Sequence, residues 1–303
     1  MPGSWPLARR SQALAQRGAI FNRIRMFFHE KGYLEVETPF RIPAPAPEAQ
    51  IDAIPSVGWF LQTSPELCMK RLLAAGYPHI FQICRCWRDG ERGSRHLSEF
   101  TMLEWYRAQA DYQVLMAETE ELVRAAAGSE SIDYRGNKID LSLPWERITV
   151  RDAFLRHTDT TAEAALADGS FDELMVERIE PHLGLTRPTF IYDYPASCSA
   201  LARLKASDPT VAERFELYIG GLEIANAFSE LIDPVEQRAR FEAEAAERAA
   251  QGKLTYPMPE KFLAALSDMP EAAGIALGLD RLVMVLLNAD CIDDVVAFTT
   301  EEL

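Results

Sequence analysis

The residues best suited to binding chemistry lie between Phe81 and Tyr106, in two runs whose side chains alternate as they do in β-strands. A short polar loop that contains glycine separates the runs, and together they predict a β-hairpin. If the strands pair with matching faces aligned, one surface of the sheet carries Gln82, Cys84, Cys86, Arg88, Phe100, Met102, Glu104 and Tyr106. This is an unusual set of side chains to bury, so the surface is a candidate floor of a binding site.

A second hairpin is predicted around Gly220-Gly221, which lies between two further alternating runs. Asn226 and Glu230 fall on the opposite face of this hairpin unless a bulge intervenes between Ala225 and Ala227. The two acids on its first face repel each other unless a cation lies between them, so a divalent metal ion is one interpretation. A solvent-facing sheet surface is the other. The residues predicted to share this first face are Glu216, Tyr218, Glu223 and Ala225.

A helix is predicted to begin at Ser64-Pro65, with serine as the N-cap and proline as the first helical residue. Glu66 in its first turn either has a binding role or simply satisfies the helix dipole. Near the end of the chain, a small apolar strand is expected to run into Asp280 as the N-cap of an apolar helix opened by Arg281.

The remaining elements are expected to position these residues. The pattern of residues 130–185 is the least informative; it predicts a strand pair near residues 134–143 and then two helices. Two glycines, Gly274 and Gly278, permit close approach to the last strand. The other predicted helices span residues 7–31, 112–127 and 233–252, and the other predicted strands span residues 34–38, 59–63 and 189–194.

Composition and charge narrow the class of protein. The 303 residues are 48% hydrophobic and 25% charged, as in ordinary globular proteins. The net charge of −15 argues against a broad nucleic-acid footprint, because phosphate neutralisation needs clustered Lys and Arg. The 5 cysteines are scattered and lack the spacing of zinc or redox sites. No apolar run is long enough to span a membrane, so we expect a cytoplasmic protein without membrane partners.

Together these stretches resemble the motifs of a class II aminoacyl-tRNA synthetase of the lysine subgroup. Motifs 1, 2 and 3 are resembled by residues 34–39, 88–100 and 274–281, respectively. The segments that form the lysine pocket are matched by residues 63–67, Glu216 and residues 223–230. The likeness extends from about residue 15 to 300 and thins between 130 and 185. It implies an α+β fold, a class II synthetase-like antiparallel sheet flanked by helices. It also implies a single catalytic domain over residues 1–303, with 130–185 as a poorly defined insertion.

Within this class, the chain is similar to the elongation factor P–(R)-β-lysine ligase family. Lysyl-tRNA synthetases carry an anticodon-binding β-barrel before the catalytic core, whereas this chain begins almost at the motif 1 helix. The segments 100–106 and 276–281 look more like the ligase family. Ala276 stands where the tRNA-charging relatives have glycine. Its methyl group would crowd an α-amino group but could pack on the CH2 of β-lysine; the alternative is a neutral exchange.

The resemblance implies a two-step reaction: ATP converts the amino acid to an adenylate, and an acceptor amine then displaces AMP. Arg88 and Arg281 are the implied catalytic residues, because arginine binds phosphate bidentately. Implied ATP-binding residues are Arg88, Asp89, Gly90, His96, Phe100, Glu223, Ile224, Gly278 and Arg281. Implied substrate-binding residues are Ser64, Pro65, Glu66, Glu104, Tyr106, Asn226, Glu230 and Ala276. Mg²⁺ is expected on Glu216 and Glu223.

The sequence departs from the family pattern at three places. Gly90 stands where motif 2 has a glutamate and is followed by Glu91; Leu97-Ser98 replaces Asn-Pro; and Ala227 replaces a glycine. The leading hypothesis remains transfer of β-lysine or lysine to elongation factor P by a homodimer that does not use tRNA. The alternatives are a stand-alone lysyl-tRNA synthetase or other amino-acid adenylate ligase, and a catalytically inactive synthetase-like binding protein.

Overall fold

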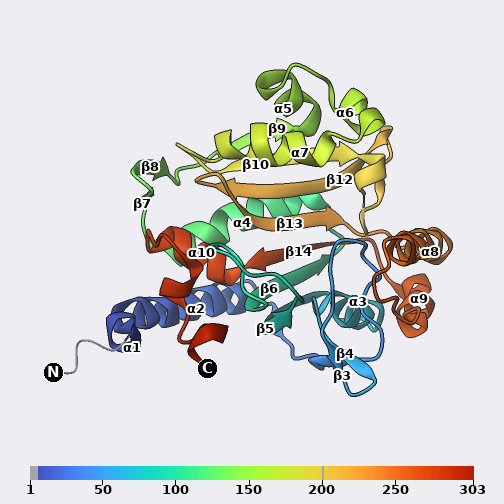
Figure 1. Ribbon diagram of the computed structural model, residues 1–303, viewed down its shortest axis with the longest axis horizontal. Helices are drawn as coiled ribbons and strands as arrows, with labels where there is room; N and C mark the ends of the chain where they lie inside the picture. The colour runs from blue at the N-terminus through green and yellow to red at the C-terminus, as the bar shows by residue number, and fades with distance from the viewer. Residues whose placement is uncertain (1–5, 200) are drawn as a thin grey trace.

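A twisted, mostly antiparallel sheet organises the computed structural model, which describes residues 6–199 and 201–303 (Figure 1). Within this part of the chain the main sheet has nine strands, in the order β1-β5-β6-β14-β13-β12-β10-β9 with β11 beside β12. Among the strand pairs that the structure describes, only β1–β5 and β9–β10 are parallel. The strands are β1 Leu34–Glu35, β5 His79–Trp87, β6 Glu99–Ala108, β9 Glu146–Thr149, β10 Thr189–Pro195, β11 Leu204–Lys205, β12 Asp208–Ile219, β13 Leu222–Ser229 and β14 Ala272–Gly278.

Two small sheets and a set of helices flank this sheet. One small sheet contains β2 Arg41–Ile42, β3 Pro55–Ser56 and β4 Trp59–Leu61, and the other contains β7 Ser131–Tyr134 and β8 Asn137–Asp140. The α-helices are α1 Pro6–Arg9, α2 Ser11–Glu30, α3 Glu66–Ala74, α4 Tyr112–Ala127, α5 Val150–His157, α6 Ala162–Asp168, α7 Phe171–Leu174, α8 Pro234–Ala250, α9 Glu260–Ala265 and α10 Leu279–Leu286. None of the described helices has the length and apolar character that a membrane span requires.

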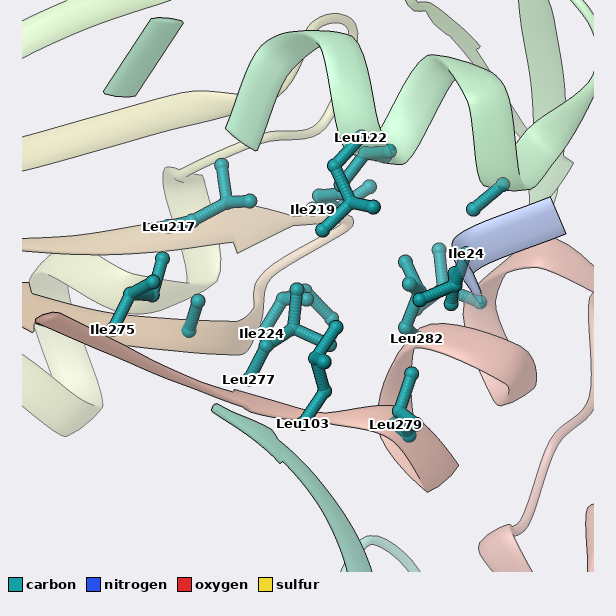
Figure 2. Packing of buried hydrophobic residues seen from close by; sticks show 14 of the residues in the cluster. Ile24, Leu103, Leu122, Leu217, Ile219, Ile224, Ile275, Leu277, Leu279 and Leu282 are labelled. Atoms are coloured by element: carbon teal, nitrogen blue, oxygen red, sulfur yellow. The ribbon is translucent and has the colours of Figure 1, made fainter. Parts of the chain in front are cut away.

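The main hydrophobic core lies between one face of the sheet and the helices α2, α4 and α10. Figure 2 shows Ile24 of α2 and Leu122 of α4 in the same cluster as side chains of the central strands, such as Leu103 and Leu277. All four side chains are fully buried, which removes a large apolar area from water. Since these helices cover one face of β6, β13 and β14, the opposite face of the same strands remains available for a site.

The first predicted hairpin is confirmed. In the β5–β6 pair Gln82 lies opposite Glu104 and Cys86 lies opposite Phe100, so the expected faces are aligned. The helix predicted over residues 112–127 is also confirmed. The Asp111 carboxylate accepts hydrogen bonds at its start, and Gly128 ends it with φ = 67°.

The second hairpin contains the anticipated bulge, but one residue earlier than expected. Leu217 pairs with Ala225 and Tyr218 pairs with Glu223, so Ile224 is the extra residue. The bulge brings Asn226 opposite Glu216. The expectation that Ala225 shares a face with Glu216 is wrong, because Ala225 is buried with its partner in the main core.

Several predicted boundaries shift. The first helix is interrupted at Arg10, and the strands expected over 34–38 and 59–63 are shorter. Helix α3 begins at Glu66, one residue later than expected, although the Ser64 hydroxyl still accepts from the Glu66 N–H at 2.9 Å. Asp280 is not an N-cap: it lies inside the first turn of α10, where its carboxylate accepts from the Thr101 N–H at 2.7 Å. The segment 130–185 forms the expected strand pair, slightly earlier. A further strand, β9, and three α-helices, α5, α6 and α7, follow it, where two helices were expected.

Candidate active site

A cavity of about 210 Å³ lies over the floor formed by β6, β13 and β14. The β5–β6 loop, the starts of α3 and α10, and the loop before β3 complete its walls. Most of the residues singled out from the sequence line it: Ser64, Glu66, Arg88, His96, Phe100, Glu104, Tyr106, Glu223, Ile224, Asn226, Ala276, Gly278 and Arg281. The residues that lie outside its lining are Pro65, Asp89, Gly90, Glu216 and Glu230.

One end of the cavity is rich in carboxylates. Glu104 is fully buried and accepts hydrogen bonds from the Ser64 hydroxyl at 2.6 Å and the Tyr106 hydroxyl at 2.7 Å. Burial and the negative charge of Glu66 raise the pKa of Glu104 to about 8. A group with such a pKa exchanges a proton near neutral pH, and when ionised it attracts a cation.

Lys70, which sequence reasoning did not single out, lies among these carboxylates. Its ammonium is 2.6 Å from Glu66 Oε1 and 2.5 Å from Glu230 Oε2, and it lies 5.1 Å from the ring centroid of Phe228. Burial lowers the pKa of Lys70, but the charges of Glu230 and Glu66 outweigh burial and the net shift is upward. Glu66 is therefore not merely a helix-dipole residue. The i, i+4 spacing of Glu66 and Lys70 was the one available signal.

Glu230 lies just behind the cavity wall. Its carboxylate and the Tyr106 ring fill the space over Gly274, so strand β14 has no room for a side chain at that position. A Cβ at Gly274 would lie 2.3 Å from Glu230 Oε1 and 2.3 Å from the Tyr106 ring. Glycine is thus required here for steric reasons, as the sequence suggested. No hydrogen bond to Glu230 Oε1 occurs within the described part of the chain, although the atom is buried. Burial raises the pKa of Glu230 despite the opposing charge of Lys70.

The other end of the cavity is basic and aromatic. The Arg88 guanidinium lies 5.2 Å from the ring centroid of Phe100, and Arg88 Nε is buried without a partner among the described residues. Arg281 contacts His96 Nε2 at 2.5 Å and Glu223 Oε2 at 3.1 Å. Burial and the positive charge of Arg281 lower the pKa of His96, so its imidazole is neutral at pH 7. Such an end suits a phosphate-bearing ligand with an aromatic base.

The loop between β5 and β6 accommodates its unusual residues locally. Gly90 has φ = 74°, a conformation that favours glycine. Glu91 lines the cavity 3.8 Å from Arg88, so an acid remains near this arginine despite the glycine before it. The Asp89 N–H donates to the Asp52 carbonyl at 2.7 Å, and Leu97 is buried.

The paired acids of the second hairpin are compensated by arginine. Arg214 lies 2.6 Å from Glu216 Oε1, and the Tyr218 hydroxyl donates to Glu216 Oε2 at 2.9 Å. Burial raises the pKa of Glu216, while Arg214 opposes that shift. Because Arg281 likewise accompanies Glu223, repulsion between the two acids does not by itself require a metal ion. Within the described residues no group of three or more His, Cys, Asp or Glu side chains is arranged to hold a metal.

The side chains of two predicted site residues, Ile224 and Ala276, pack partly or wholly against the protein interior. The Ile224 side chain packs in the main core, so it can offer the cavity only its backbone (Figure 2). Ala276 lies between Asn226 and Glu104 in the sheet and packs against the buried Cys84, Cys86 and Met102. Its methyl group therefore forms part of the floor itself.

Residues 7–302 match the model of the tRNA synthetases class II (D, K and N). The chain is 42% identical over 305 residues, 94% of each protein, to the elongation factor P–(R)-β-lysine ligase of Proteus mirabilis (strain HI4320). It is 40% identical over 331 residues, 98% of each protein, to the protein of that name from Pectobacterium carotovorum subsp. carotovorum (strain PC1). The identity to the Salmonella typhi protein of that name is 40% over 321 residues, 95% of each.

Proposed function

Because the chain belongs to the elongation factor P–(R)-β-lysine ligase family within the class II tRNA synthetases, we propose that it ligates β-lysine to elongation factor P. The carboxylate of β-lysine attacks the α-phosphorus of ATP, which gives an aminoacyl-adenylate and pyrophosphate. The amine of a lysine side chain on elongation factor P then displaces AMP. Neither step needs an enzyme nucleophile, so catalysis rests on positioning and charge stabilisation.

The observation that carries this proposal is the division of one cavity into a basic end and a carboxylate end. Arg88 and Arg281 suit the phosphates of ATP, and Phe100 offers a ring for adenine. His96, Ile224 and Gly278 line the proposed nucleotide site, and Asp89 and Gly90 would contribute from the loop just outside that lining. At the other end Glu230, with Tyr106 and Asn226, would bind the distal ammonium of β-lysine and Glu66 the nearer one. Ser64, Pro65 and Glu104 support these side chains, and Ala276 packs on the substrate.

For Mg²⁺ we propose the pair Glu216 and Glu223, since the ion prefers hard oxygen ligands and often combines one or two carboxylates with phosphate oxygens. Only Glu223 of the pair lines the cavity, and Arg281 beside it would join the phosphates. Bound Mg²⁺ would neutralise negative charge on the departing pyrophosphate.

The proposed working unit is a homodimer of single-domain subunits that act without tRNA. Phe40 is 47% exposed and Leu34 is 49% exposed, on either side of the motif 1 proline, Pro39. Burial of these two exposed side chains in a subunit contact would remove apolar area from water. Light scattering should give twice the subunit mass, and Phe40→Asp should reduce it to one subunit. A monomeric wild-type protein would contradict this expectation.

The test is to incubate the protein with ATP, Mg²⁺, (R)-β-lysine and purified elongation factor P, and to weigh the product by mass spectrometry. We expect the mass of one lysyl group to be added. Pyrophosphate exchange with β-lysine, α-lysine and other amino acids identifies the activated substrate. Efficient tRNA charging without modification of elongation factor P would support a lysyl-tRNA synthetase instead, and absence of any adenylate would support an inactive binding protein.

A further inference from the structure

Glu48 is a cavity-lining acid that the proposed two-step reaction has not yet used. It lies in the loop before β3, which passes beside α8 in Figure 1, and its side chain is half-buried at the cavity wall. Its carboxylate makes no hydrogen bond or ion pair with any residue in the part of the chain that the structure describes. The electrostatic environment of Glu48 includes Glu66, Arg88, Glu244 and Lys70.

The other acids and the imidazole of the cavity all have partners. Glu66 is paired with Lys70, Glu104 accepts from two hydroxyls, and Glu223 is paired with Arg281. The same holds for the remaining three: Glu91 with Arg88, Asp280 with Arg17 and His96 with Arg281. Glu48 is therefore the acid in the described cavity lining whose carboxylate has no protein partner, so both of its oxygens can accept a ligand or a proton.

The backbone around Glu48 is held firmly even though its carboxylate is free. Arg248 donates to the Glu48 carbonyl at 2.7 Å and to the Ile51 carbonyl at 2.8 Å. The Ala49 N–H donates to Glu244 at 2.7 Å, and Lys253 donates to the Ala49 carbonyl at 2.7 Å. A fixed backbone with an unpaired side chain at its centre is what a positioned acid–base group requires.

The second step needs such a group. The acceptor is a lysine side chain, whose ordinary pKa of about 10.4 leaves it an unreactive ammonium at neutral pH. We propose that Glu48 is the general base that deprotonates this acceptor; the inference rests on the proposed function. Supporting it, burial and the charge of Glu66 raise the pKa of Glu48 to about 7, with Glu244 adding to the shift and Arg88 and Lys70 opposing it. A base with a pKa near the working pH transfers protons most effectively.

The step balances without a co-reactant. One N–H proton of the acceptor ammonium passes to the Glu48 carboxylate, and the freed lone pair attacks the carbonyl carbon of the adenylate. The C–N bond forms, and the bond from that carbon to the AMP oxygen breaks with its electron pair leaving on AMP. The second N–H proton leaves the new amide nitrogen to solvent. Glu48 later returns its own proton to solvent.

The experiment separates the two steps with Glu48→Gln. Pyrophosphate exchange with β-lysine should stay within about threefold of wild type, while single-turnover transfer from preformed adenylate to elongation factor P should fall about 100-fold or more. Hydroxylamine, which is already neutral at pH 7, should accept the β-lysyl group equally fast from both proteins. Glu48→Asp, which keeps a shorter base, should retain part of the transfer rate. The matched control is Glu242→Gln, an exposed α8 acid with the same change of charge, and it should match wild type.

The pH profile provides a second readout. Wild-type transfer should rise as pH increases through the pKa of Glu48 and then level off, because the carboxylate form is the base. Glu48→Gln should lack this plateau and rise tenfold per pH unit as the acceptor itself deprotonates. Normal transfer by Glu48→Gln, or equal loss of exchange and transfer, would overturn the proposal. Failure of wild type to activate β-lysine would instead overturn the proposed function.

Discussion

At the scale of single residues, Lys70 changes how the carboxylate end is understood. Its buried ammonium forms ion pairs with both Glu66 and Glu230, the two acids that are proposed to bind the amino groups of the substrate. Its side chain has no exposed surface, so it has little room to move aside when a ligand enters. Glu230 Oε1 nevertheless remains without a protein hydrogen bond in the described chain. Lys70 therefore acts as a fixed counter-charge that leaves further oxygen atoms for the substrate.

We expect Lys70→Met to raise the KM for β-lysine in pyrophosphate exchange by at least about tenfold, roughly the loss of one good charged hydrogen bond. Without the ammonium the pKa of Glu230 rises further, because Lys70 is the charge that lowers it. The KM should therefore reach its minimum at a higher pH than in wild type. Lys70→Arg should retain part of the effect, and Arg71→Met, an exposed change on the same helix, should match wild type. A lower KM in Lys70→Met would show that Lys70 competes with the substrate.

The raised pKa of Glu104 leads us to predict that substrate binding releases protons. With a pKa raised to about 8 by burial and by Glu66, its carboxyl is largely protonated at pH 7 in the free protein. A cationic substrate favours the ionised form, so affinity should increase as pH rises from 6 to about 8. Calorimetry in two buffers with different ionisation enthalpies should give different heats, and Glu104→Gln should reduce the number of protons released. Identical heats in both buffers would refute this prediction.

At the scale of elements, the sequence predicted the features that depend on residues close together in the chain. The β5–β6 register follows from two alternating arms, and α4 follows from its apolar spacing and the glycine after it. The sequence could not predict that the bulge lies at Ile224. The side chains alternate with a period of two both before and after a bulge, so the pattern does not show where the extra residue is. Lys70 and Glu48 were missed because their roles depend on Glu230 and Arg248, which lie far away in the chain.

Helix α8 fixes the loop that carries Glu48, and Arg248 is its anchor. The guanidinium is fully buried and donates to the carbonyl oxygens of Glu48, Ile51 and Leu254. It also donates to the Asp52 carboxylate at 2.7 Å and to the Tyr256 hydroxyl at 2.8 Å. Arg248→Met leaves these acceptors without a donor, so we expect a loss of about 2 kcal/mol or more in the free energy of unfolding. Amide hydrogen exchange should accelerate in residues 48–53.

The control for this prediction is Arg238→Met on the same helix, where an exposed pair with Glu260 is removed. Exposed pairs contribute little, so thermal unfolding of this variant should match wild type. Equal exchange in residues 48–53 of wild type and Arg248→Met would show that the loop is fixed by other contacts.

At the scale of the whole molecule, charge bears on the choice of acceptor. The chain has 31 basic and 46 acidic residues, a net charge of −15. Many of its arginines are already paired with acids, as Arg92 is with Asp293 and Glu301. This net negative charge repels the phosphates of a polynucleotide, whose neutralisation by Lys and Arg is the main source of affinity for nucleic acids.

We therefore expect tRNA to bind more weakly than about 10⁻⁴ M at physiological salt, the weak limit for non-specific binding of nucleic acids. Fluorescence anisotropy with labelled tRNA should stay flat over the micromolar range, and no lysyl-tRNA should form when ATP and lysine are supplied. The same preparation should modify elongation factor P, which controls for an inactive sample. Micromolar binding that weakens steeply as salt is added would instead reveal a local basic patch, and it would move the acceptor from a protein to tRNA.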